Sequence, residues 1–263
     1  PTYQDLANKA DVLYKTCQNL YQKRKAGTLT QNDIDAACAA FKDARRDWEQ
    51  SEAFLYGAAT DNQIDPHIDS WPLDHSQLTQ ALNNADVIAG ITGENPAKYV
   101  YENNSNFDSV LGFHGLEFVL FRNGQNRTVA AFNAEKETEA GLTSVKTIDE
   151  AAFAVAVAGD LRNMTYLLEY GWLGLSTPTS HQEQLANAMW VINGTRYHGL
   201  SAKNIPYRDF LRYATTEQGW FPTWHEALQN IFDGGCGNIC NEVAEQKLGQ
   251  AYRVATGTGT SED

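Results

Sequence analysis

Apolar residues recur at three- and four-residue steps through most of this chain, and this periodicity limits its possible folds more than any other feature. Residues 3–27 show it clearly, with Leu6, Leu13, Cys17 and Leu20 on one stripe. Comparable stripes occupy residues 30–57, 74–90, 109–121, 147–174 and 180–192. A stripe that repeats every 3.6 residues predicts an amphipathic α-helix that packs through its apolar face. The sequence therefore predicts an all-α protein of antiparallel helical bundles.

The expected helix boundaries carry ordinary start and stop signals. Thr30 is a candidate N-cap, and Thr147 with Glu150 three residues later fits a capping box. Residues 98–102, KYVYE, form the one extended run that we expect before residue 120. Shorter helical patterns follow at residues 207–215, 223–232 and 238–254.

Charge and hydropathy exclude some classes of function. The 263 residues carry a formal net charge of −13. A nucleic-acid-binding protein needs a basic surface to neutralise phosphates, so we expect no nucleic-acid partner. No run approaches the roughly 18 apolar residues that a membrane span requires. The chain begins at Pro1 rather than Met, and we expect it to have been processed.

Four cysteines suggest two disulfides. Cys17 and Cys38 lie at equal distances from the predicted turn near residues 27–28, so two antiparallel helices would bring them to the same level. Cys236 and Cys240 in GGCGNIC would close a small second loop. An even number of cysteines with two plausible pairings predicts an oxidising compartment. The alternative is four reduced, buried thiols.

Two polar side chains interrupt the apolar segment SVLGFHGLEFVLF at residues 109–121. On a helix His114 and Glu117 share one face, separated by a rise of about 4.5 Å. Gly112 and Gly115 flank the histidine, and a glycine inside a helix costs about 1 kcal/mol relative to alanine. We therefore expect another backbone or a ligand to approach closely there. Because the other residues are apolar almost all round, we expect a buried helix whose carboxylate needs a partner.

Two interpretations of this pair remain open. One is a hydrogen bond in the core, between His114 and Glu117 or between Glu117 and an arginine such as Arg45, Arg46 or Arg122. The other is a metal site, because helical bundles present carboxylate and imidazole ligands to iron or manganese at this spacing. A metal site needs further ligands, for which the candidates by residue type are Glu49, Glu52, Asp65, His67 and Asp69.

The common zinc-peptidase motifs do not fit this segment. Gly115 stands where HExxH needs a glutamate, and Phe118 stands where HxxEH needs a histidine. A later histidine, His181, His198 or His225, could still complete a His-Glu-His zinc set.

Three linked motifs resemble those of the imelysin family, in particular its imelysin-like and iron-regulated bacterial members. The first motif, W-E-x-x-E-x-x-x-x-G, matches Trp48, Glu49, Glu52 and Gly57. The second, D-x-W-P, matches Asp69, Trp71 and Pro72 in a connector that is too long for a simple bundle turn. The third, G-x-H-x-x-E, matches Gly112, His114 and Glu117.

The resemblance implies an all-helical, imelysin-like fold of two bundle-like halves, with a metal site near their junction. We accordingly expect a helical bundle at residues 1–175 that carries the GxHxxE helix, and a second helical segment at 176–263. Family members are usually longer, so this second segment is expected to be incomplete at its C-terminal end. The resemblance also implies the bacterial cell envelope, either the periplasm or the outer membrane, with a possible lipid anchor on the precursor.

The leading hypothesis is a cell-envelope metal-binding protein linked to iron uptake, whose partner is a metal ion or a metal-bearing ligand. His114 and Glu117 would be ligands of iron or zinc, while Glu52 and Asp69 would be further ligands or would orient His114. One alternative is a zinc-dependent peptidase of the imelysin type, with Glu52 as the candidate base. Another alternative is a non-enzymatic envelope binding or scaffold module.

Overall fold

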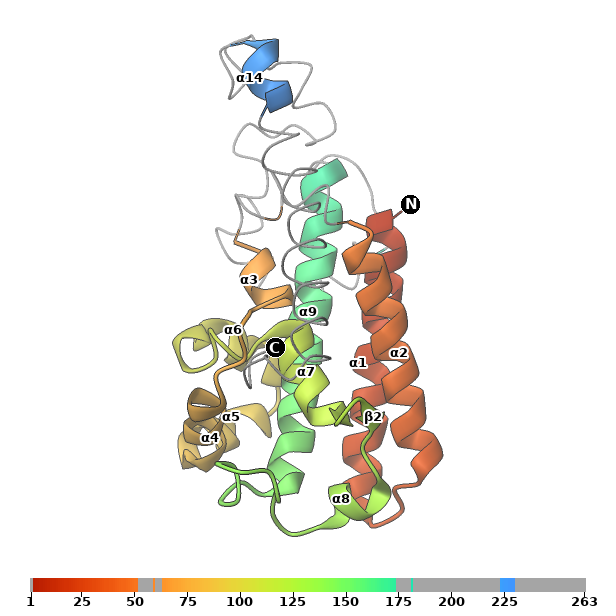
Figure 1. Ribbon diagram of the computed structural model, residues 1–263, viewed down its shortest axis with the longest axis vertical. Coiled ribbons are helices and arrows are strands. Elements are labelled where there is room, and N and C mark those ends of the chain that lie inside the picture. The colour runs from red at the N-terminus through yellow and green to blue at the C-terminus, as the bar shows by residue number, and fades with distance from the viewer. Residues whose placement is uncertain (1, 52–58, 60–62, 174–180, 182–222, 230–263) are drawn as a thin grey trace, which may run out of the picture.

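Three long helices form the frame of the protein. The computed structural model describes residues 2–51, 59, 63–173, 181 and 223–229. Helix α1 (Thr2–Ala26) and helix α2 (Gln31–Glu49) are antiparallel and joined by a short turn at Gly27. Helix α9 (Thr147–Leu173) packs along α1 and runs in the direction of α2 (Figure 1).

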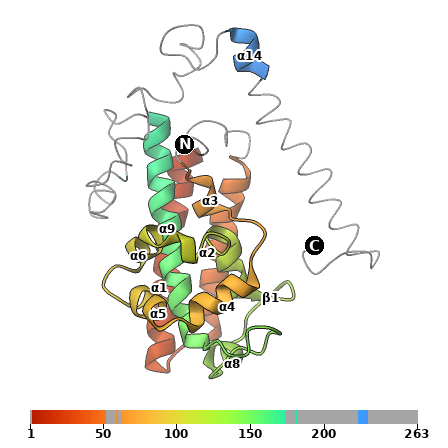
Figure 2. The ribbon, with the colours of Figure 1, turned by 90° about the vertical axis from the view of Figure 1, so that its left-hand side faces the viewer.

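The remaining described elements are short, and most of them cover the face of α9 that α1 and α2 leave open (Figure 2). They are α3 (Asp65–Ile68), α4 (His75–Asn83), α5 (Ala85–Ile91), α6 (Pro96–Glu102), the 3₁₀ helix η3 (Asn104–Asn106), α7 (Gly112–Leu120), β1 (Phe121–Arg122), β2 (Gln125–Asn126), α8 (Val129–Asn133) and the separate α14 (Trp224–Gln229). The two strands form one antiparallel hairpin in which Phe121 faces Asn126.

Helix α9 is central because its first half is apolar on every side. Residues 151–158 are all buried. A helix of this kind must be surrounded by other elements. Small residues allow the neighbours to approach closely: a Cβ on Gly159 would lie 2.9 Å from the Cβ of Ala97 on α6. The core therefore lies between α9, the α1–α2 pair and the short helices.

The all-α fold predicted from the periodicity is confirmed, but several local predictions are wrong. Residues 98–102 form most of α6 rather than an extended run, because Pro96 and the Asn95 cap begin a helix there. The helix expected at 74–90 is two helices, since Asn84 ends α4 and caps α5 through the amides of Asp86 and Val87. Helix α7 begins at Gly112 rather than at 109.

The predicted Cys17–Cys38 disulfide is absent from the structure, in which both residues are free cysteines. Antiparallel packing of α1 and α2 does place both thiols in the core, within electrostatic range of each other. The Cys38 thiol instead contacts the carbonyl oxygen of Leu120 at 3.5 Å. Cys236 and Cys240 lie outside the described residues, as does most of the predicted segment 176–263.

Hydropathy within the described helices is moderate. Not one helix of the described part of the chain combines the length and the apolar character that crossing a bilayer requires.

Candidate metal centre

Gly112 brings two distant segments of the chain together at the start of α7. Its φ is +67°, and a Cβ there would lie 2.0 Å from the carbonyl oxygen of Ile68. The backbone of residues 68–69 therefore crosses directly over the N-terminus of α7. The close approach that the two glycines predict is thus made by backbone. At Gly115 the near atom is the carbonyl oxygen of Val110, 2.1 Å from the Cβ position.

This crossing places the Asp69 carboxylate against the imidazole of His114. His114 Nε2 lies 3.0 Å from Asp69 Oδ1, and His114 Nδ1 lies 3.5 Å from Glu117 Oε2. The Trp71 ring packs against the imidazole at an interplanar angle of 51°, with 4.6 Å between the ring centroids. The histidine ring is therefore held between two carboxylates and against an indole.

Asp69 is itself fixed by helix α2. The indole N–H of Trp48, whose side chain is fully buried, donates to Asp69 Oδ2 at 2.8 Å. The guanidinium of Arg45 forms an ion pair with Asp69 Oδ1 and a second one with Glu49 at 2.6 Å. The Trp-Glu segment of the sequence thus contributes to the centre through Asp69, and Glu49 acts as a partner of Arg45.

The charged groups of this cluster stabilise the ionised forms of one another. Burial raises the pKa of the Asp69 carboxyl, but His114 and Arg45 outweigh burial and hold that pKa well below its ordinary range. Burial lowers the pKa of His114, yet the hydrogen bonds to Asp69 and Glu117 raise it above its ordinary value of 6.5. These contacts favour the ionised form of Asp69, which orients the imidazole.

Glu117 lies differently from the sequence-based expectation. Its side chain is 56% exposed, whereas the expected carboxylate was buried. The apolar residues of α7 face the core, and Glu117 shares with His114 the one side of the helix that opens outward. Of the proposed arginine partners, Arg122 is paired with Glu137 at 2.7 Å and Arg45 with Asp69. Glu117 is thus available to a ligand without the desolvation cost of a buried charge.

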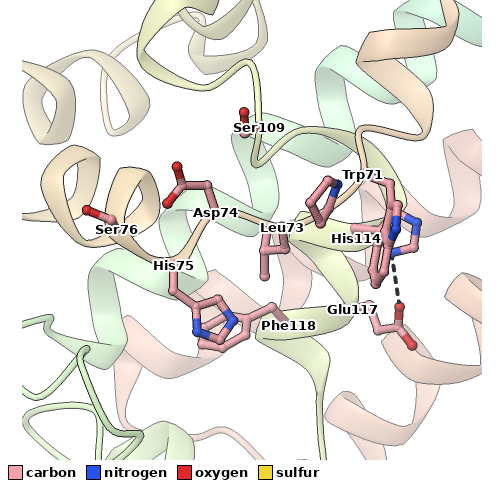
Figure 3. A pocket seen from close by; sticks show the side chains of 10 residues that line it. Trp71, Leu73, Asp74, His75, Ser76, Ser109, His114, Glu117 and Phe118 are labelled. Carbon is pink, nitrogen blue, oxygen red and sulfur yellow. Dashed lines mark ion pairs between the residues drawn. The ribbon is translucent and has the colours of Figure 1, made fainter. Parts of the chain in front are cut away.

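A pocket of about 770 Å³ opens beside this pair (Figure 3). The pocket is lined by residues 71–76, by Ser109, and by His114, Glu117 and Phe118 of α7. Hydrogen bonds join the segment at 74–77 to Ser109: the Asp74 amide donates to the Ser109 carbonyl at 3.0 Å, and the Ser109 amide donates to Gln77 Oε1 at 2.9 Å. The His114–Glu117 pair therefore borders a cavity of small-molecule size.

The three sequence motifs that contribute to this centre predict membership of a known protein family. The family model described as imelysin matches residues 1–263, the full length of the chain. The chain belongs to the imelysin family. The family resemblance that the three motifs predict is confirmed.

Two relatives carry descriptions that mention iron. The iron-regulated protein A of Synechococcus elongatus is 31% identical over 121 residues, which are 46% of this chain and 28% of that protein. A solved structure from Parabacteroides distasonis, described as an iron-regulated protein A precursor, has a TM-score of 0.51 and 25% identity. That match covers 82% of this chain and 55% of the solved one. The chain thus spans less than two thirds of the length of each relative.

Two other candidate histidines of this imelysin-family chain, His67 and His181, have partners of their own. His67 Nδ1 lies 2.6 Å from Asp160 on α9, and both side chains are buried. This pair ties α3 to the central helix, and α3 leads directly into Asp69. His181 contacts Glu169 at 2.5 Å and Asn8 at 3.0 Å, near the end of α9. Neither histidine joins His114.

The donor set suits a metal ion but is partial. His114 Nδ1 and Glu117 supply one nitrogen and one carboxylate, which iron and zinc both accept. Asp69 is occupied by Trp48 and Arg45, so its geometry favours an orienting role over direct ligation. The described residues include no group of three or more His, Cys, Asp or Glu side chains that could hold a metal ion. Glu52 and His198 lie outside the described residues.

The sequence motifs do not include every residue that shapes the centre. Arg45 is expected there only as a partner of Glu117, and no motif indicates a role for His75 or Phe118, whose ring centroids lie 5.2 Å apart in the pocket. Asp160, the partner of His67, also lies outside the motifs. An aspartate inside the apolar run of residues 151–168 was the available signal, because a buried carboxylate requires a partner.

Proposed function

We propose that this protein binds a transition-metal ion, iron or zinc, through His114 and Glu117 and serves iron handling in the bacterial cell envelope. The observation that carries the proposal is the pair at the pocket edge, with His114 Nδ1 3.5 Å from Glu117 Oε2. Two donors on a single ion are separated by about this distance when each metal–ligand bond is about 2.1 Å.

Asp69 prepares the imidazole for this role. When Nε2 donates its proton to the Asp69 carboxylate, the lone pair of Nδ1 is directed at Glu117. A carboxylate behind a ligating histidine fixes its tautomer and makes it a better donor. Trp48 and Arg45 in turn prevent Asp69 from turning away.

The relatives support iron as the biological metal. Both comparisons describe an iron-regulated protein A, in a cyanobacterium and in Parabacteroides distasonis. Family membership supports the proposed envelope location, which is periplasmic or attached to the outer membrane by a lipid on the precursor. An acidic chain with a net charge of −13 also raises the local concentration of cations.

Calorimetric titration of anaerobic Fe²⁺ and of Zn²⁺ tests the proposal. We expect His114→Ala and Glu117→Gln each to weaken binding at least tenfold, because each removes one donor. His75→Ala is the matched control, since His75 lines the same pocket without contacting His114, and it should leave the affinity unchanged. Equal affinity in the wild type and His114→Ala would refute the proposal.

The Asp69→Asn variant tests the proposal that Asp69 orients His114 rather than binding the metal ion itself. The amide retains the size of the side chain but loses the charge that holds the Nε2 proton, so we expect a loss of affinity of about 10–100-fold. Glu52→Gln, measured in the same way, tests whether Glu52 supplies a further donor, and a loss as large as that of Glu117→Gln would assign it one.

A further inference from the structure

The pocket beside the His114–Glu117 pair is much larger than an ion requires. Its volume is about 770 Å³, whereas one water occupies about 30 Å³ in the liquid. Even a complete shell of six waters would leave most of this space unused. Pockets that bind small organic molecules in proteins usually have volumes of roughly 300–1,000 Å³, so this one has room for such a molecule.

One wall of the pocket is aromatic, and an exposed member of it, Trp71, lies at the metal donors. Trp71 is 53% exposed and packs against the ring of His114, while Phe118 and His75 pack together further along (Figure 3). Leu73 lies between them, and Pro72 also lines the pocket. An open indole face of this kind gains free energy when a second planar ring covers it. The wall therefore suits a flat aromatic molecule that reaches the metal donors.

The donors and charges select the kind of aromatic molecule. Glu117 and His114 give the ion two ligands, and iron accepts more than two, so a molecule in the pocket can supply others. The carboxylates of Glu117 and Asp74 line the same pocket and disfavour a strongly anionic guest. One ferric ion with one doubly deprotonated catechol carries a charge of about +1, whereas three catecholates give about −3.

We propose that the pocket binds the metal ion as a 1:1 complex with a small aromatic oxygen chelator of the catecholate type, whose ring packs against Trp71. This inference rests on the proposed function, since His114 and Glu117 hold the same ion. Chelation releases two protons from the catechol to solvent and leaves the oxidation state of the metal unchanged. The protein therefore recognises both parts of a metal-bearing ligand: the metal ion through His114 and Glu117, and the aromatic ring of the chelator through Trp71.

Gallium(III) is the appropriate probe because it has the charge of ferric iron and does not undergo redox reactions with catechol. Its 1:1 complexes with catechol and with oxalate have the same charge and the same number of donor oxygens, and only the first has an aromatic ring. We expect the wild type to bind the catechol complex about tenfold more tightly than the oxalate complex, as measured by calorimetry. Trp71→Leu should abolish this preference, by lowering the affinity for the catechol complex about tenfold more than the affinity for the oxalate complex.

Trp71→Phe is the matched variant, because it retains an aromatic face and should retain most of the preference. Unchanged melting temperatures of both variants would show that the fold is intact. Equal binding of the two complexes by the wild type, or an equal loss of both in Trp71→Leu, would overturn the inference while leaving the metal site in place. If neither complex binds a wild type that does bind Fe²⁺ or Zn²⁺, the inference fails and the metal site stands; if Fe²⁺ and Zn²⁺ do not bind either, the proposed function itself fails.

Discussion

At the scale of single residues, the backbone of Gly112 decides whether the centre forms. Its positive φ and its lack of a Cβ allow Ile68 and Asp69 to cross the start of α7. The crossing is what brings Asp69 within 3.0 Å of His114. Gly112, which has no side chain, thus determines the surroundings of His114.

Gly112→Ala should therefore be costly. The new Cβ would lie 2.0 Å from the Ile68 carbonyl oxygen in a left-handed conformation, and we expect a loss of about 2–4 kcal/mol in the free energy of unfolding. Gly124→Ala is the control: its φ of +71° is similar, but nothing lies within 4 Å of the new Cβ. We expect about 1 kcal/mol there. Urea denaturation measures both, and equal losses would contradict this account of Gly112.

At the scale of elements, a buried cluster of four charges joins the end of α7 and the hairpin to the start of α9. Arg127 NH2 lies 2.8 Å from Glu137 and 2.9 Å from Glu150, and Arg122 joins both carboxylates from the side. The guanidinium of Arg122 also lies 3.7 Å from the centre of the Phe118 ring, which lines the pocket.

The predicted Thr147–Glu150 capping box is absent because Glu150 turns inward to Arg127 and Thr147 donates to the Phe132 carbonyl.

This cluster makes stability depend on pH in a defined direction. Burial raises the pKa of Glu150 to about 7, whereas hydrogen bonds and Arg127 outweigh burial and lower the pKa of Glu137 to about 2. In the unfolded chain both pKa values are near 4.5. The folded protein therefore holds the Glu150 proton more tightly, so the contribution of Glu150 falls as pH rises from about 4.5 to 7. Glu137 contributes stability above its unfolded pKa, and this is lost as pH falls toward 2.

Glu150→Gln tests this assignment, because the amide resembles the protonated acid and does not titrate. Between pH 5 and 8 the wild type should lose on the order of 2 kcal/mol in the free energy of unfolding relative to the variant. Urea titrations at several pH values provide the measurement. Parallel pH profiles of the two proteins would show that Glu150 is ionised throughout this range.

At the scale of the whole molecule, the long helices enclose Cys17 and Cys38. Burial raises the pKa of both thiols to about 12, so neither forms an appreciable thiolate at neutral pH. We expect both to resist iodoacetamide in the native protein at pH 8 and to react in concentrated urea without reductant, as peptide mass spectrometry would show. Protection that persists in urea and disappears only after reduction would instead reveal the disulfide that the sequence predicts.

The sequence by itself determined the three long helices and the shared face of His114 and Glu117, because both follow from the local 3.6-residue period. It also indicated, through Gly112, that something approaches closely. Only the tertiary structure decided that the approaching group is the backbone at Ile68, that Asp69 is held by Trp48 and Arg45, and that Glu117 faces outward. These contacts join residues far apart in the chain, such as His67 and Asp160, which are separated by 93 positions. The packing of whole helices sets such contacts, and no local pattern records which faces will meet.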